Sequence, residues 1–225
     1  MATAHDLIAA VNAGDAELVG RIVADDPSLA TARDAAGVSA LMLALYRFDR
    51  AVTDVLLSAD PELDAFEAAA LGYIDRIIQA LQVETDAAIA FSSDGFTALH
   101  LAAFFGKAQA ARILLDAGAR VDACTRNEFA NQPLHAAAAG RHIEVCRLLL
   151  AAGADVDATQ HGYTPLHEAA QHGDNEMVEL FLSAGADPAR TVNGGGTPAD
   201  IAEAAGHHDL AVRLLGVSPT APQDG

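Results

Sequence analysis

The chain has 225 residues, of which 31 are Asp or Glu and only 13 are Lys or Arg, so its formal net charge at pH 7 is −18. A surface this acidic repels phosphate groups, so we expect neither nucleic acid nor a membrane as partner, and a basic protein surface would be attracted to it. Hydrophobic residues make up 52% of the chain but aromatic residues only 5%, which predicts a packed protein built from small side chains.

The sequence also indicates in which part of the cell the protein is expected. No run of 18 apolar residues occurs, and the first residues carry no basic segment ahead of an apolar one, so we expect neither a membrane span nor a signal peptide. Two cysteines, Cys124 and Cys146, cannot form a disulfide framework. We therefore expect a cytoplasmic protein.

The first half of the chain is a duplication with a period of 58 residues. Residues 1–58 and 59–116 each begin with a helical segment, "DLIAAVNAGDAELVGRIV" or "DAFEAAALGYIDRIIQAL", and continue with a segment that contains a glycine turn. We expect two helix pairs in each copy. The residues that coincide are Asp6 with Asp64, Gly14 with Gly72, Gly37 with Gly95, Ala40 with Ala98, and Leu56 with Leu114.

The second half repeats a shorter phrase about every 33 residues: "FTALHLAAFFG", "NQPLHAAAAGR", "YTPLHEAAQHG" and "GTPADIAEAAG". In the third copy, Thr164 suits a helix N-cap, Pro165 the first helical position, and Gly173 the left-handed turn that ends the helix. We expect Leu180 and Leu182 to bury the helix that follows. A period near 33 with two short helices per unit indicates a solenoid of stacked helix pairs.

These phrases, together with "ARILLDAGARVDA", "CRLLLAAGADVDA" and "VELFLSAGADPAR", resemble the ankyrin repeat. The resemblance implies an all-α solenoid of helix-turn-helix units with short hairpin-like loops, in which His100, His135 and His167 are structural. We expect a single domain over residues 1–216 and a disordered tail over 217–225. The expected repeats are 4–33, 34–58, 63–90, 92–124, 127–158, 159–191 and 192–216.

The resemblance also implies that hairpin tips and first helices line a concave surface that binds protein. Of the 11 Phe and Tyr residues, six fall on positions expected there, and an exposed aromatic cluster is typical of a binding site. Alternatively, Phe104 or Phe105 turns inward and fills a gap between helix layers. The six aromatic residues are Tyr46, Phe96, Phe104, Phe105, Phe129 and Tyr163. Val38, Arg47, His161 and His172 are expected on the same surface.

The loop "CTRNEFANQ" is two residues longer than the period allows. It has Ala130 and Gln132 where the other units have Gly and Thr, and we expect it to project beyond its neighbours with Arg126, Glu128 and Phe129. It is either a specificity element or a neutral insertion of the kind that loops tolerate.

Catalytic and cofactor chemistry has no motif in this sequence. "VNGGGTPAD" lacks the Lys-Ser/Thr of a phosphate loop, Cys124 has no base near it in sequence, and Cys146 occupies a core position. We therefore expect a monomeric, non-enzymatic protein without cofactor or bound metal that binds an unknown protein, and the acidic surface would favour a partner with a basic surface. The alternative is a small-molecule or metal-ion sensor that uses the aromatic residues with His161 and His172.

Overall fold

The computed structural model describes residues 1–83, 86–192 and 195–216. Over these residues the chain is all helical, with seven helix pairs and three isolated β-bridges at hairpin turns, which confirms the expected fold class. The pairs are α1 (Ala4–Ala13) with α2 (Ala16–Asp25), α3 (Ala40–Tyr46) with α4 (Arg50–Ser58), α5 (Ala65–Leu71) with α6 (Ile74–Val83), α7 (Ala98–Phe104) with α8 (Ala108–Asp116), α9 (Pro133–Ala139) with α10 (Ile143–Ala151), α11 (Pro165–Gln171) with α12 (Asn175–Ser183), and α13 (Pro198–Ala204) with α14 (His208–Leu215). A short 3-10 helix, η1 (Pro27–Thr31), follows α2.

The Thr-Pro-Leu-His phrase folds as the sequence predicts. Pro165 is the first residue of α11, and Nδ1 of His167 lies 2.8 Å from Oγ1 and 3.2 Å from the backbone nitrogen of Thr164. The same contact joins His100 to Thr97, and the other ring nitrogen of His100, Nε2, lies 3.1 Å from the backbone oxygen of Asn131 in the next hairpin. The histidines therefore fix each hairpin to its own helix, and His100 also fixes the next hairpin.

Each helix pair buries its apolar side chains against its neighbours in the stack. Leu166, Ala169 and Ala170 of α11 are fully buried, and their counterparts in α7 and α9 belong to the same core. The expectation for α12 holds in part: Leu180 and Leu182 pack against the core but are only partly buried, whereas Met177 and Phe181 are fully buried. The buried pair is four residues apart and so lies on one helical face, beside which Leu180 and Leu182 fall.

The 58-residue duplication persists in three dimensions. Helices α2 and α6 begin at Ala16 and Ile74, and α3 and α7 begin at Ala40 and Ala98, in both cases 58 residues apart. Only α1 departs from this relation, because it begins about one turn earlier than α5. Asp6 is therefore the third residue of α1, whereas Asp64 is the N-cap of α5, so their coincidence in sequence is not a structural equivalence.

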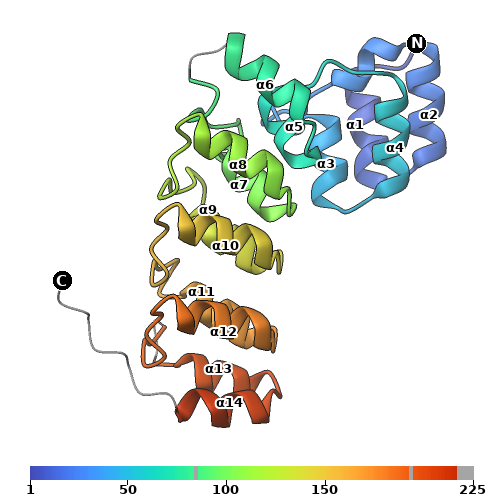
Figure 1. Cartoon of the computed structure of the whole chain (residues 1–225). Coiled ribbons are helices and arrows are strands. Elements are labelled where there is room, and N and C mark those ends of the chain that lie inside the picture. The colour runs from blue at the N-terminus through green and yellow to red at the C-terminus, as the bar shows by residue number, and fades with distance from the viewer. Residues whose placement is uncertain (84–85, 193–194, 217–225) are drawn as a thin grey trace.

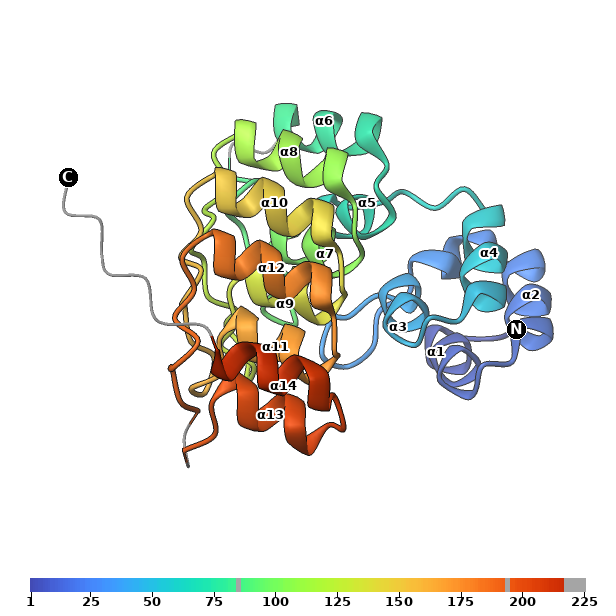
Figure 2. The ribbon, with the colours of Figure 1, turned by 60° about the horizontal axis from the view of Figure 1, so that its bottom comes forward.

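The stack is interrupted between its second and third pairs. One buried core joins α1 to α4, another joins α5 to α14, and a small cluster connects them, made of Val38, Met42, Ala70 and Leu101. We call this cluster the junction. Helices α3 and α5 touch much less than α7 and α9 do, and in Figures 1 and 2 α1–α4 form a block set to one side of the α5–α14 column.

Polar bonds reinforce the junction. The Tyr46 hydroxyl donates to Oδ2 of Asp94 at 2.6 Å, and Nη2 of Arg33 lies 2.9 Å from Oδ2 of Asp64. Beside this ion pair, Glu67 is buried, and burial and then the charge of Asp64 raise the pKa of its carboxyl group. The two blocks are thus joined by fewer apolar contacts than adjacent pairs within the column, together with these two polar bonds.

Other expectations on domain organisation have separate outcomes. No helix among residues 1–83, 86–192 and 195–216 is long and apolar enough to cross a membrane. The division into seven ankyrin repeats within one domain stays a prediction. The tail at 217–225 lies outside the described residues.

Gly95 offers a direct test of how closely adjacent hairpins pack. Its φ is +86°, and a Cβ added there would lie 2.9 Å from the backbone carbon of Arg126. Gly185 has nearly the same φ, +92°, but its Cβ would meet nothing within 4 Å. We expect Gly185→Ala to lower the unfolding free energy by about 1 kcal/mol through backbone strain alone. Gly95→Ala should lose a further ~1–3 kcal/mol by overpacking.

Urea unfolding followed by circular dichroism measures both losses. Equal losses in the two variants would contradict the close approach of the hairpins.

Candidate functional site

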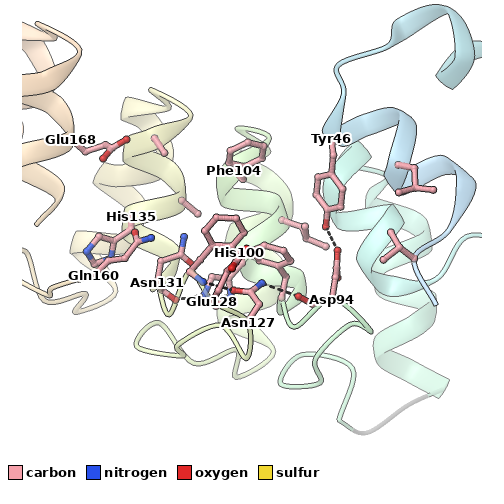
Figure 3. A pocket seen from close by; sticks show the side chains of 17 residues that line it. Tyr46, Asp94, His100, Phe104, Asn127, Glu128, Asn131, His135, Gln160 and Glu168 are labelled. Atoms are coloured by element: carbon pink, nitrogen blue, oxygen red, sulfur yellow. Dashed lines mark hydrogen bonds between the residues drawn. The ribbon is translucent and has the colours of Figure 1, made fainter. Parts of the chain in front are cut away.

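A groove of about 660 Å³ runs along the first helices and the hairpin loops. Its lining comes from α3, α7, α9 and α11 and from the loop that precedes each of them, as Figure 3 shows. Four of the predicted site residues line it: Tyr46, Phe96, Phe104 and Phe129. The side of the stack that carries the first helices and hairpin loops therefore holds a depression lined in part by aromatic side chains.

Ring contacts connect five of the six predicted aromatic residues into one cluster. Centroids lie 6.2 Å apart for Phe129 and Phe96, for Phe96 and Tyr46, and for Tyr46 and Phe105, and 5.1 Å apart for Phe105 and Phe104. None of the five is fully buried.

The sixth, Tyr163, lies outside this cluster. Its ring contacts His167, with centroids 5.5 Å apart.

The alternative that an aromatic side chain fills a gap also holds in part. Tyr46, Phe96 and Phe105 pack against the junction, and Phe105 does not line the groove. Val38 was expected on the exposed surface, which is wrong, because it is buried as a member of the junction. The five connected aromatic residues therefore have two roles: some pack against the junction, where the stack is interrupted, and some line the groove.

The long loop, residues 124–132, is bound to both neighbouring hairpins, so the expectation that it projects beyond them is wrong. The backbone nitrogen of Arg126 donates to the oxygen of Gly95 at 2.8 Å, and Nδ2 of Asn127 donates to the oxygen of Asp94 at 2.8 Å. On the other side, Nε2 of His161 lies 2.9 Å from the backbone oxygen of Glu128. These contacts hold Phe129 over Phe96 at the edge of the groove, where it is 48% exposed.

The remaining predicted site residues lie away from the groove lining. The guanidinium group of Arg126 sits 3.8 Å from the centre of the Phe91 ring, in a cation–π contact. Arg47 and His172 are exposed and follow α3 and α11, and His161 and Tyr163 belong to the hairpin before α11. None of these five residues lines the groove.

Phe48 is an exposed aromatic residue that the sequence analysis missed. It is 72% exposed, and its φ is +53°, in the left-handed region that a bulky side chain rarely adopts. Its ring lies 6.1 Å from those of both Phe104 and Phe105. The 58-residue shift places Phe48 on Gly106, so an aromatic residue at a glycine position was the pattern that could have revealed it.

The groove carries negative charge and no compensating cation. Asp94, Glu128 and Glu168 line it, and no Lys or Arg is among the described lining residues. Two histidines, His100 and His135, also line it, but burial lowers the pKa of both, that of His100 to about 4, so both are neutral at pH 7. Burial and the neighbouring Asp94 raise the pKa of Tyr46, which keeps its hydroxyl a donor.

Possible metal ligands and the two cysteines were also located in the structure. Within the described part of the chain, no three His, Cys, Asp or Glu side chains form a group that could hold a metal ion. Cys146 is fully buried and its pKa is raised to about 12 by burial, which confirms it as an inert core residue, whereas Cys124 is exposed. Part of "VNGGGTPAD", at 193–194, lies outside the described residues.

Paired helices joined by hairpin turns and stacked into a column define a helical repeat protein. A family model for three copies of the ankyrin repeat matches residues 65–160 and 121–192, which together span more than half of the chain. The chain therefore belongs to the ankyrin-repeat family. No curated protein matches it. Members of this family are generally modules for protein–protein interaction, and the fold is typically a non-enzymatic scaffold.

The buried His100 predicts a specific pH dependence. Because its pKa is lower in the folded than in the unfolded chain, its contribution to stability is complete above pH ~6.5 and is lost as the pH falls toward 4. The loss should reach about 3 kcal/mol, from roughly 1.4 kcal/mol per pKa unit. His100→Met, which copies Met42 from the corresponding position 58 residues earlier, should lower stability at pH 7 but weaken the dependence on acid.

Unfolding free energies of both proteins at pH 7.5 and 4.5 test this. If His100→Met loses as much unfolding free energy between pH 7.5 and pH 4.5 as the wild type does, this pH dependence does not come from His100.

Proposed function

We propose that the chain is a non-catalytic protein-binding module that takes part of a partner protein into the groove. The observation that carries this proposal is the aromatic floor: Phe96, Phe104 and Phe129 are only partly covered, although the core of the column is filled mostly with Leu and Ala. Partly exposed aromatic side chains in a depression supply contact area that is desolvated when a partner binds.

The position of the groove also supports a macromolecular partner. It is built from neighbouring helix pairs and the loops between them, so a bound chain can contact several repeats at once. The long loop bounds the groove through Phe129 and Glu128, which favours its interpretation as a specificity element over that of a neutral insertion. The monomeric state and cytoplasmic location stay predictions.

A small molecule is the second candidate for the groove. The volume of about 660 Å³ falls within the range of roughly 300–1,000 Å³ that is usual for small-molecule sites, and the lining is mostly apolar. The metal-ion form of this alternative has less support, because His161 and His172 flank α11 at opposite ends and neither lines the groove. Thermal stabilisation by a metabolite, with no protein captured, would favour the small molecule.

Capture of a partner tests the proposed function. We expect the immobilised wild-type chain to retain a protein from lysate of the source cells, and Phe129→Ala to reduce that retention about 30-fold, the equivalent of the ~2 kcal/mol typical of an anchor residue. Val212→Ala is the matched control, because Val212 is 70% exposed on α14, outside the groove. Circular dichroism checks that both variants are folded.

Equal retention by wild type and Phe129→Ala, or loss with Val212→Ala alone, would place the binding surface elsewhere.

A further inference from the structure

The groove has two chemically distinct ends. At α3, α7 and the hairpin before α7, the lining is mostly apolar, with Leu43, Tyr46, Phe96, Leu101 and Phe104, and Phe129 lies over Phe96 from the long loop. Toward α11, the lining becomes polar, with Gln160 and the carboxylate of Glu168, and Glu128 lies on the loop between the two ends, as Figure 3 shows. A ligand that fills the groove therefore contacts an aromatic surface at α7 and a carboxylate at α11.

The carboxylates at the acidic end are available to a ligand. Asp94 is already engaged, because its two oxygens accept from Tyr46 at 2.6 Å and from Ser92 at 2.5 Å. Glu168 has only the His172 ring nearby, with Nε2 3.5 Å from Oε1, and no described Lys or Arg forms an ion pair with Glu128 or Glu168. The groove thus presents two carboxylates that no described Lys or Arg neutralises, and Glu168 is half-buried, where charge interactions are stronger than in open solvent.

The distance from the aromatic residues at α7 to the carboxylate of Glu168 on α11 sets the spacing of the two side chains that the occupant needs. Packed helices lie ~8–10 Å apart, so the two steps from α7 through α9 to α11 span roughly 16–20 Å. An extended chain advances ~3.3–3.6 Å per residue, so about five or six residues fit along this distance. An apolar side chain at one end and a cation at the other are therefore expected within one short segment.

We propose that the occupant is an extended segment of a partner protein that carries a large apolar side chain followed or preceded, within about five residues, by Lys or Arg. The apolar side chain lies against Phe96, Phe104 and Phe129, and the cation pairs with Glu168 or Glu128. This rests on the proposed function and adds the chemistry of the partner. Acidic segments are rejected, because they would place like charges together at the α11 end.

The absence of tryptophan from the chain makes the test direct. We would use the synthetic peptide GWSGSKKSG, blocked at both ends, as the probe, since its indole is then the only one present and its lysines follow the indole by four and five residues. Its emission should shift to the blue on entering the groove, and its Kd at 50 mM salt should be at least tenfold lower than that of GWSGSEESG. Calorimetry with GASGSKKSG, which lacks the anchor, should show binding at least tenfold weaker than that of the tryptophan probe.

Matched variants separate the groove from general attraction to an acidic protein. Glu168→Gln should raise the Kd of the lysine probe about fivefold, whereas Glu144→Gln, the same charge change on α10 outside the groove, should alter it less than twofold. Phe129→Ala should abolish the blue shift.

Three results would overturn the proposal. Equal binding of the lysine and glutamate probes, lost in Phe129→Ala, would reject a basic segment but leave the groove as a binding site. Equal weakening by Glu168→Gln and Glu144→Gln would show unspecific charge attraction. No binding of the lysine probe would reject this partner chemistry, while retention of a cell protein that depends on Phe129 would still uphold the proposed function.

Discussion

No helix pair in this chain can bury its own apolar face, and the rest of the structure depends on that constraint. The second helix of a pair covers only part of the leucines and alanines of the first, and the pairs above and below cover the rest, so the pairs must stack in register. His100 and His135 also fix the position of each hairpin loop relative to the next, because the Nε2 atom of each ring lies within hydrogen-bond distance of a backbone oxygen of the next hairpin. Stacking in register places the exposed positions of successive first helices side by side, and a continuous groove results.

The groove lies beside the one place where the stacking weakens. Between α3 and α5 the apolar contact is reduced to a small junction, and larger side chains take over the space that leucine and alanine leave. Tyr46 and Phe96 pack against the junction and line the groove as well. The aromatic residues Tyr46 and Phe96, in an otherwise aromatic-poor chain, thus fill the interruption of the stack and form part of the apolar lining of the groove.

The sequence was sufficient for whatever depends on local geometry. Thr164, Pro165 and His167 act within one turn, so their spacing alone predicts the cap, and the 58-residue period predicts which first helices are equivalent. Tyr46, Phe96, Phe104 and Phe129 were found for the same reason, since repeat position determines the face. The inward packing of Phe105, the contact of Arg126 with Phe91 and the interruption before α5 depend on how whole helix pairs meet, which no single repeat encodes.

The central claim is that partners bind the groove side of the column and not its second helices. Amide hydrogen exchange of the chain, alone and with a captured partner, measures this most directly. The account predicts added protection in the hairpin at 91–97, in the long loop and at the start of α9, with little change in α8, α10 and α12. Protection concentrated on those second helices, with the long loop unchanged, would contradict it.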